Sequence, residues 1–220
     1  PLWNLYYHDA NNNNTVDAGE GIQSLTEYKA ANPNNTISKT TTSTYSDATQ
    51  KYIGKSAIPK IRGAFKLNAK IYNFSISSQF GYSLGGYSYD SVYAGLLDND
   101  QIGANNWHAD VRNSWKKPGD ITDVPKLISD RNTQVNSSSS RFITSSDYLA
   151  LNNVRVGYTV PSKFIENSGI SSLNLWMSGD NLLLLSARDG FNPATSETGS
   201  SDVYRYQPLT TITFGVRAKF

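Results

Sequence analysis

Hydrophobic and polar side chains alternate along the final stretch of the chain, residues 212–220. A period of two predicts a β-strand, because successive side chains of a strand point to opposite faces of its sheet. A strand of a soluble β-sandwich alternates in this way, and so does a strand of a transmembrane β-barrel, which has lipid on one side and a polar interior on the other. The apolar side ends on an aromatic residue and consists of Ile212, Phe214, Val216, Ala218 and Phe220.

The same alternation recurs along the rest of the chain. The predicted strands lie at about residues 1–7, 58–72, 74–85, 143–160, 173–185 and 208–220. The second and third of them are separated only by Asn73, which predicts a β-hairpin with a tight turn. In the fourth, the parity of the apolar positions changes at Asn152–Asn153, which predicts a β-bulge, because one extra residue flips the faces of a strand.

The connections between these strands alternate in length, in the order long, short, long, short, long. Outer-membrane barrels sort their connections in this way, because their extracellular loops are long and their periplasmic turns are short. Most loops of compact soluble domains are much shorter than the long segments here. The predicted fold is therefore all-β, an antiparallel, up-and-down transmembrane β-barrel. Six strands would leave two unpaired edges in hydrocarbon, so we expect the chain to supply only part of the barrel.

The composition argues against several other classes of protein. No segment approaches the ~20 consecutive apolar residues of a membrane helix, and the net charge of +2 gives no reason to expect a nucleic-acid partner. The chain has no Cys, and its two histidines, His8 and His108, lie in polar segments without a nucleophile beside them. We therefore expect neither a thiolate metal site nor an enzyme.

A polar loop at residues 9–20 has the spacing of a calcium-binding loop. Oxygen-bearing residues occupy positions 1, 3, 5, 7, 9 and 12, which lets a short loop surround a hard cation. Two features depart from the usual pattern: Asn14 stands where Gly is usual, and only three of the ligands are carboxylates. The alternative is an Asn-rich solvent loop that binds nothing. The expected ligands of Ca²⁺ are Asp9, Asn11, Asn13, Thr15, Asp17 and Glu20.

Two further groups of residues are candidates for contact with a solute or a partner. Aromatic rings stack on sugars and hold peptide side chains, although rings near a membrane also form the interfacial girdle. The aromatic candidates in the long segments are Tyr87, Tyr89, Trp107 and Trp115. Basic residues on the polar side of the strands would form an electropositive wall for an acidic solute or pair with buried carboxylates. These residues are Lys60, Arg62, Lys66, Lys70, Arg155, Arg217 and Lys219.

Five groups of short motifs occur in a fixed order and cover nearly the whole chain. They are 52–60 with Gly63 and Phe65; 106–107, 110–111, 113–115 and 123–127; 146–161; 178–182; and 190–193. These motifs resemble the C-terminal third of the SusC/RagA family, the TonB-dependent outer-membrane transporters of Bacteroidetes, and 146–161 is the closest match.

The resemblance implies a barrel of about 22 strands around an N-terminal plug, of which residues 1–220 would supply the last strands. The plug and the TonB box would lie upstream. The expected function is uptake of oligosaccharides or oligopeptides across the outer membrane, driven by the TonB complex, together with a SusD-like surface lipoprotein that closes over the barrel. Outer-membrane lipids or lipopolysaccharide would surround the barrel. Phe214, Val216 and Phe220 would carry the signal that the barrel-assembly machinery reads.

Two alternatives stay open at this point. One is a secreted, soluble β-sandwich that binds glycans. The other is a surface barrel protein with no role in import.

Overall fold

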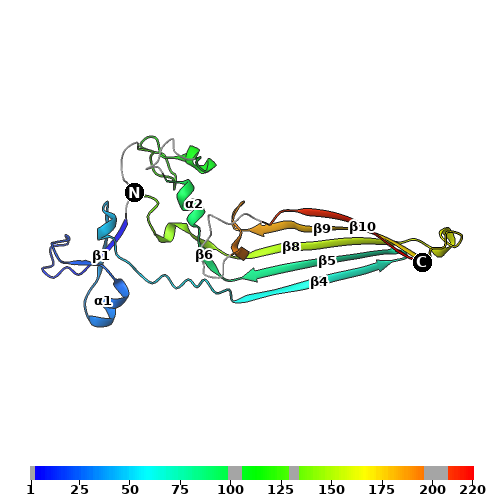
Figure 1. Cartoon of the computed structure of the whole chain (residues 1–220). Helices are drawn as coiled ribbons and strands as arrows, with labels where there is room; N and C mark the ends of the chain where they lie inside the picture. Colours follow the sequence, from blue (N-terminus) through cyan, green and yellow to red (C-terminus); the bar gives the residue numbers. More distant parts are fainter. Residues whose placement is uncertain (1–2, 99–105, 129–133, 196–207) are drawn as a thin grey trace. The chain divides into compact units, whose positions relative to one another are not determined.

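The computed structural model describes residues 3–98, 106–128, 134–195 and 208–220 (Figure 1). The chain divides into two compact units, of which the first comprises Pro1–Gly54 and Tyr93–Ser140 and the second Lys55–Val92 and Arg141–Phe220. Helical elements are short: α1 (Leu25–Ala31), α2 (Ser91–Leu96), η1 (Tyr45–Asp47), η2 (Ala109–Asn113), η3 (Ser140–Phe142), η4 (Ser162–Phe164) and η5 (Pro193–Thr195). Within the described ranges, no helix has the length and hydrophobicity needed to cross a membrane.

The first unit contains a small antiparallel sheet with the strand order β2-β1-β3. Its strands are β1 (Trp3–Tyr7), β2 (Gly21–Ile22) and β3 (Ser38–Thr42). Leu5 and Tyr7 of β1 are buried, as are Ile22 and Leu25, which supply the apolar contacts of this sheet. Thr49 ties the sheet together, because its hydroxyl accepts a hydrogen bond from the amide of Tyr6 (2.8 Å) and donates one to the carbonyl of Ile22 (2.6 Å).

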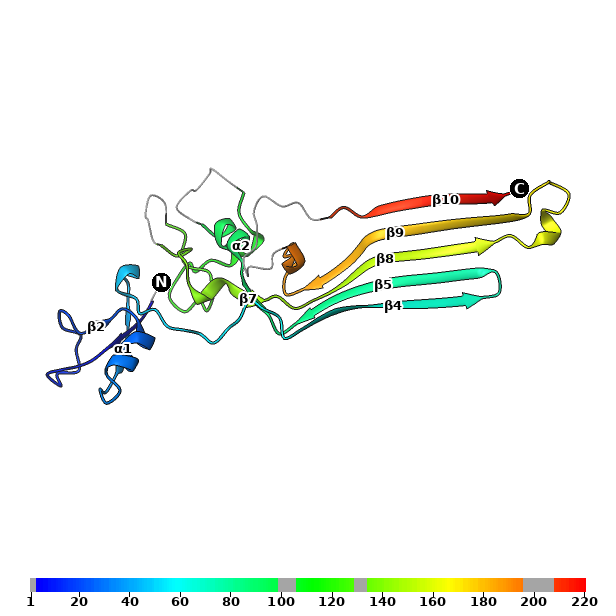
Figure 2. The same cartoon turned by 60° about the horizontal axis from the view of Figure 1, so that its bottom comes forward.

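The second unit is built on a five-stranded antiparallel sheet with the order β10-β9-β8-β5-β4 (Figure 2). The strands are long: β4 (Ile61–Ile71), β5 (Phe74–Leu84), β8 (Tyr148–Thr159), β9 (Ser172–Ser186) and β10 (Thr211–Lys219). A separate two-stranded ribbon pairs β6 (Tyr87–Tyr89) with β7 (Ile143–Ser145). The predicted antiparallel, mostly β architecture is therefore present, as an open sheet.

The short connections lie at one end of the strands of this sheet and the long connections lie at the other end (Figure 2). Tyr72–Asn73 joins β4 to β5, and Tyr72 takes a positive φ of 51° in this tight turn. The segment 160–171 joins β8 to β9 at the same end of the sheet's strands, and the carboxyl terminus lies there as well. The connections 85–147 and 187–210 begin and end at the opposite end of the strands. The sorting of connection lengths expected from the sequence is thus a property of the sheet.

The predicted bulge is confirmed. Asn152 has no partner in the register with either neighbouring strand, since Leu151 and Asn153 are the flanking paired residues on both sides. On β9 the matching irregularity lies between Asp180 and Leu183, and Asn181 takes a positive φ of 53°. Asn tolerates this left-handed conformation better than most residues, because its short polar side chain makes local hydrogen bonds.

Two strands differ from the sequence expectation. The first predicted strand, 1–7, does not join the large sheet, because β1 pairs with β3 over its full length, from Trp3 opposite Thr42 to Tyr7 opposite Ser38. Five of the six expected strands therefore lie together. The predicted strand 143–160 is divided into β7 and β8, because Asp147 turns the chain: its amide donates to the hydroxyl of Ser145, and its carboxylate accepts from the amide of Gly85.

Candidate functional site

The five-stranded sheet has one apolar face and one polar face, and its register decides which residues share each of them. Directly opposed residues of antiparallel strands project to the same side. On the apolar face, Phe65 lies opposite Phe80, and Val156 lies opposite Met177, which in turn is opposite Phe214. On the polar face, Lys66 is opposite Gln79 and Arg155 is opposite Ser178.

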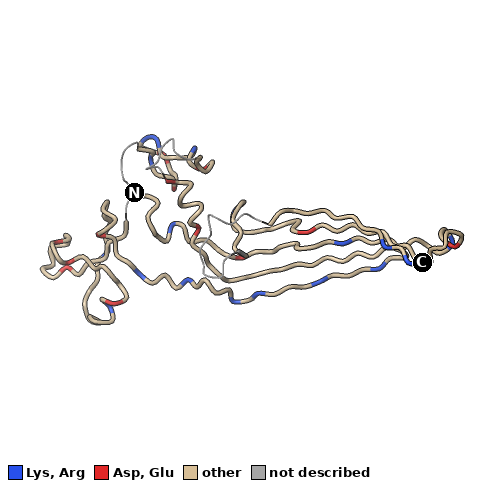
Figure 3. Tube along the Cα trace, viewed as in Figure 1, with Lys and Arg blue, Asp and Glu red and all other residues tan. Residues whose placement is uncertain are grey.

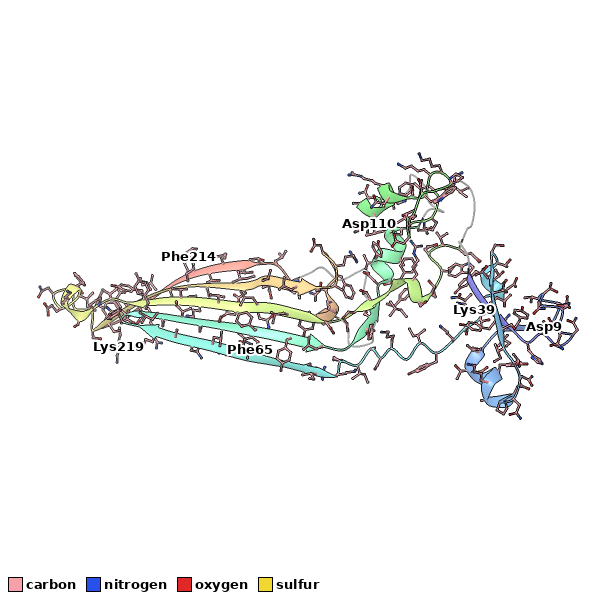
Figure 4. The ribbon with its side chains drawn as sticks, turned by 180° about the vertical axis from the view of Figure 1, so that it is seen from behind. Asp9, Lys39, Phe65, Asp110, Phe214 and Lys219 are labelled. Carbon is pink, nitrogen blue, oxygen red and sulfur yellow. The ribbon has the colours of Figure 1, made fainter. Side chains whose placement is uncertain are left out.

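The apolar face is exposed in the structure. Phe65 retains 44% of its accessible surface and Phe214 retains 74% (Figure 4). The other large apolar residues on this face that are exposed are Ile61, Leu67, Ile71, Phe74, Ile76, Leu84, Leu149, Leu175, Met177, Leu183, Leu185, Ile212 and Val216. A contiguous exposed apolar area of this extent is unusual for a soluble monomer and indicates contact with a membrane or with a partner.

Aromatic pairs join neighbouring strands across the apolar face. Phe65 and Phe80 are stacked with ring centroids 4.8 Å apart, and Phe74 and Tyr158 are tilted against each other at 4.7 Å. Tyr82 lies over Gly63, where an added Cβ would be 2.9 Å from its hydroxyl. Such cross-strand pairs stabilise a sheet by roughly 0.2–1 kcal/mol each and fix its register.

A hollow of about 520 Å³ lies on the apolar face of β8, β9 and β10. The residues of the apolar face that line the hollow are hydrophobic, and one of them carries a phenol hydroxyl. They are Val156, Tyr158, Leu175, Met177, Phe214 and Val216. The hollow therefore offers no charged side chain to whatever contacts this face.

Basic residues are more frequent than acidic ones along the five strands (Figure 3). The register places Arg62, Lys66, Lys70, Arg155, Arg217 and Lys219 on the polar face. Within the five strands as described, the only carboxylate is Asp180, which accepts a hydrogen bond from the side-chain amide of Asn153 (2.7 Å). Six of the seven basic residues predicted to form a stripe thus lie on a single face of the sheet, and the seventh, Lys60, precedes β4.

Trp176 is the largest side chain on the polar face. It is directly opposite Gly157 on one neighbouring strand and Gly215 on the other, and a Cβ added to Gly215 would overlap its indole. The guanidinium carbon of Arg155 lies 4.1 Å from the centroid of this ring. A cation over an aromatic face contributes about 0.5–1 kcal/mol at an exposed site. The absence of a side chain at Gly215 therefore leaves room for the indole of Trp176, which in turn contacts the guanidinium of Arg155.

The predicted calcium loop connects β1 to β2 in the first unit. Asp9 accepts hydrogen bonds from the amides of Asn13 (3.0 Å) and Asn14 (2.7 Å), and Glu20 accepts from the amides of Ala10 and Asp17 (both 3.0 Å). Asn14 takes a positive φ of 60° at the position where Gly is usual in such loops. The backbone fold of the loop suits a calcium site.

The side-chain amides of the loop point their nitrogens, not their oxygens, at the carboxylate of Asp17. Asn11 and Asn13 both donate to the same carboxylate oxygen of Asp17, at 2.7 and 2.8 Å. Calcium binds oxygen, so both amides would have to turn before a cation entered. Among the described residues, no group of three or more His, Cys, Asp or Glu side chains is arranged to hold a metal. The donor set proposed from the sequence also includes Asn and Thr15, so calcium binding stays a prediction.

The four aromatic candidates divide between the units. Tyr87 and Tyr89 lie on β6 in the second unit: the ammonium of Lys55 is 3.8 Å from the Tyr87 ring centroid, and Tyr89 packs edge-on against the buried Phe142 at 6.1 Å. Trp107 and Trp115 are half-buried in the first unit, where the amide of Trp115 donates to the carbonyl of Val124 (2.9 Å). Of the four, Tyr87 lines a pocket in its own unit, whereas the side chain of Tyr89 packs against Phe142.

The three residues of the predicted assembly signal are exposed. Phe214 and Val216 belong to β10 and lie on the apolar face, and Phe220 follows the strand with 88% of its surface accessible. No sequence pattern indicates the ion pair in which the guanidinium of Arg188 donates two hydrogen bonds to the buried carboxylate of Asp90. It joins the segment after β9 to the end of β6, 98 residues earlier, a separation at which no local pattern reveals a partner.

Comparison with known proteins relates this chain to TonB-dependent receptors. No family model matches it. The chain is 28% identical to TonB-dependent receptor P3 of Formosa agariphila over 185 residues, which are 80% of this chain and 18% of that protein. It is 28% identical to TonB-dependent receptor P39 of the same organism over 116 residues, which are 50% of this chain and 11% of that protein. The chain is a homologue of TonB-dependent receptors.

Solved structures support the fold. The chain matches part of the RagAB peptide importer in its closed-closed state with a TM-score of 0.69 and 22% identity, over 98% of this chain and 21% of that chain. The open-open state of the same importer gives a TM-score of 0.65 and 24% identity, over 82% and 19%. The resemblance expected from the motifs is therefore confirmed. The chain spans about a tenth to a fifth of the length of these proteins.

Proposed function

We propose that the five strands form part of the transmembrane barrel wall of a TonB-dependent nutrient importer in an outer membrane. The observation that carries this proposal is the exposed apolar face of the sheet, opposite a polar face rich in cations. In a barrel, the first face would contact acyl chains and the second would line the interior. The homology to TonB-dependent receptors supports the same assignment.

The sorting of the connections gives the proposed orientation. Barrels of outer membranes carry their long loops outside and their short turns on the periplasmic side. The strand ends at Tyr72–Asn73 and the carboxyl terminus would therefore face the periplasm. The opposite strand ends, from which 85–147 and 187–210 leave, would face the exterior. A full barrel of about 22 strands would supply neighbours for the free edges of β4 and β10.

The transported solute would be an oligopeptide or an oligosaccharide, and import would be driven by TonB through a TonB box elsewhere in the full-length protein. A SusD-like lipoprotein would close the exterior side. The peptide importer RagAB, which this fold matches in part, favours peptides as the first solutes to test. Residues 9–20 would form a structural Ca²⁺ site in one of the loops, since their backbone already has the required turn.

The experiment is uptake of labelled oligomers by cells that express the full-length protein and its lipoprotein partner. Uptake of oligopeptides or oligosaccharides that stops when TonB is deleted would support the proposal. A full-length protein that resides in the outer membrane but imports nothing would favour a surface barrel without transport. A protein that is monomeric in buffer without detergent would favour the soluble β-sandwich.

A further inference from the structure

A pocket of about 370 Å³ lies on the polar face of the sheet, at the strand ends from which the long connections leave. Its volume is at the lower end of the range of about 300–1,000 Å³ that is typical of sites for small ligands. The pocket therefore suits one part of an oligomer better than the whole of it. All of its described lining residues belong to the second unit.

One row of residues across three strands contributes to the lining. Arg62 of β4 is directly opposite Ser83 of β5, which is directly opposite Tyr148 of β8. Arg62 is the only charged residue among the described lining residues, and it already has an interaction within the chain. The pocket therefore gives no reason to expect an anionic ligand. The row leaves an aliphatic hydroxyl and a phenol for contact with a ligand.

Two serines of the pocket are buried and have hydroxyls without a protein partner. Ser83 and Ser88 each retain only 6% of their accessible surface, and both line the pocket. Within the described residues, neither hydroxyl makes a hydrogen bond to the protein. Buried polar side chains nearly always have a hydrogen-bond partner, because a hydroxyl that loses water without gaining one is costly. These two hydroxyls therefore depend for their hydrogen bonds on whatever fills the pocket.

The walls of the pocket are held by backbone hydrogen bonds. The amide of Tyr87 donates to the carbonyl of Ser56 (2.9 Å), and the amide of Ser146 donates to the carbonyl of Gly86 (3.0 Å). The ammonium of Lys55 lies 3.8 Å from the centroid of the Tyr87 ring and so covers one of its faces. Residues 57–59 and 193–194, which include two prolines, complete the lining. Such a site is largely pre-formed, which reduces the entropic cost of binding a ligand.

The chemistry of the lining matches a neutral sugar. Five lining residues carry a hydroxyl, and each hydroxyl can both donate and accept a hydrogen bond, as each hydroxyl of a sugar can. Aromatic rings and prolines offer apolar surface to the C–H groups of a sugar ring. An apolar peptide side chain would leave the buried hydroxyls unpaired, and a charged one would have only the already engaged Arg62 beside it. The five residues are Ser83, Tyr87, Ser88, Ser146 and Tyr148.

We propose that this pocket binds one uncharged sugar unit of the transported oligomer. The inference rests on the proposed function, which it deepens by naming the class of solute. Ser83 and Ser88 exchange hydrogen bonds with hydroxyls of the sugar, and the ring of Tyr148 contacts its C–H groups. The match to the RagAB peptide importer concerns the fold and does not identify the ligand of this pocket. Oligopeptides are therefore the competing probe.

The test compares variants of the full-length protein in complex with its lipoprotein partner. Ser83→Ala and Ser88→Ala each remove one buried hydroxyl and little volume. The matched control is Ser77→Ala, on the same strand and face as Ser83 but outside the pocket. Binding is measured by calorimetry with a panel of uncharged oligosaccharides, made of glucose, mannose, galactose or xylose units, and with a library of oligopeptides.

Loss of a neutral hydrogen bond weakens binding by roughly 2- to 10-fold. We expect that loss for Ser83→Ala and for Ser88→Ala with at least one of the oligosaccharides, and no change for Ser77→Ala. Wild-type affinity of both pocket variants for every oligosaccharide would overturn the inference. So would a wild-type complex that binds none of the oligosaccharides, or an equal loss of affinity for the oligopeptides.

A second variant serves if the serine variants assemble poorly. Ala194 lines the pocket and is exposed, so Ala194→Trp adds a large side chain to the pocket without disturbing a buried residue. This variant should abolish binding of the oligosaccharide and leave binding of oligopeptides unchanged. Unchanged binding of the oligosaccharide would refute the pocket as its site.

The two proposals fail in different ways. If the wild-type complex binds and imports oligopeptides and the pocket variants change nothing, only the sugar site is refuted and the proposed importer stands. If the wild-type complex binds none of the probes and imports no oligomer, the proposed function fails and the pocket proposal fails with it.

Discussion

Two neighbouring residues of β4 allow a direct test of which solvent each face of the sheet contacts. Leu67 lies on the apolar face opposite Ser78, and Asn68 lies on the polar face opposite Ser77. Both are exposed in the structure, so an arginine at either position meets no steric barrier. If the apolar face contacts hydrocarbon, Leu67→Arg places a charge in lipid, whereas Asn68→Arg adds one more cation to a polar interior.

The expected magnitude depends on depth in the membrane. With 11 residues and a rise of about 3.3 Å per residue, β4 is about 36 Å long. At a tilt of about 40° it spans about 28 Å, close to the apolar band of about 25 Å around such barrels. Leu67 then lies near the bilayer midplane, where an arginine costs about 2–4 kcal/mol, and Ile71 lies near the interface, where the cost is about 0–1 kcal/mol.

Depth dependence separates a membrane from a protein core. Leu67 and Ile71 are equally exposed in the structure, at 57% and 58%. If a second layer of protein covered this face, both side chains would be buried by it. Their equal exposure in this chain gives no reason to expect that arginine is tolerated better at position 71 than at position 67. Lipid predicts a difference of about 1–4 kcal/mol between the two positions.

The assay is unfolding by denaturant of the full-length protein reconstituted in lipid vesicles, with folding monitored by heat-modifiable migration on gels. The expected order of stability is Asn68→Arg, equal to the wild type, then Ile71→Arg, and then Leu67→Arg as the least stable. Equal losses for Leu67→Arg and Ile71→Arg, or a loss for Asn68→Arg as large as that for Leu67→Arg, would refute the assignment of the apolar face to lipid.

Three shorter tests address close packing, the calcium loop and assembly. Gly215→Ala should displace Trp176 and cost about 1–3 kcal/mol in the same unfolding assay, whereas Thr213→Ala, on the same strand and face, should cost little; equal losses would contradict this packing. Calcium should raise the thermal unfolding midpoint of the wild type and have less effect on Glu20→Gln, and a wild type that does not respond would rule out a stabilising site. Deletion of Phe220 should lower the amount of folded barrel in the outer membrane, and undiminished levels would exclude a role in assembly.

The large sheet could be predicted from the sequence because each of its strands has two faces of different polarity. A period of two is visible without knowledge of the partner strand, and it located β4, β5, β9 and β10 to within a few residues. The bulge could be predicted for the same reason, since Leu151 and Val154 fit one face only if an extra residue separates them. The tight turn at Asn73 could be predicted because only this residue separates the two predicted strands in the sequence.

Features that depend on partners distant in the sequence could not be predicted. β1 has the alternation of a strand but only five residues, and nothing in them indicates that they pair with Ser38–Thr42 and not with a long neighbour. The pocket required the register, because Arg62, Ser83 and Tyr148 become one row only when three strands are aligned. The basic residues were recognised as a stripe, but the sequence did not distinguish the one that lines a pocket.

The bulge on β8 decides which residues of this strand lie on each face of the sheet. If Asn152 were paired as in a regular strand, the parity set by Val154 would continue towards the start of the strand. Leu149 and Leu151 would then turn to the polar face, and Tyr148 would turn to the apolar one. The bulge is accommodated where Gly81 has no side chain, since an added Cβ there would lie 3.0 Å from the side-chain nitrogen of Asn152. The bulge thus keeps Leu149 and Leu151 on the apolar face and, in the same strand, places Tyr148 on the polar face, in one row with Ser83 and Arg62.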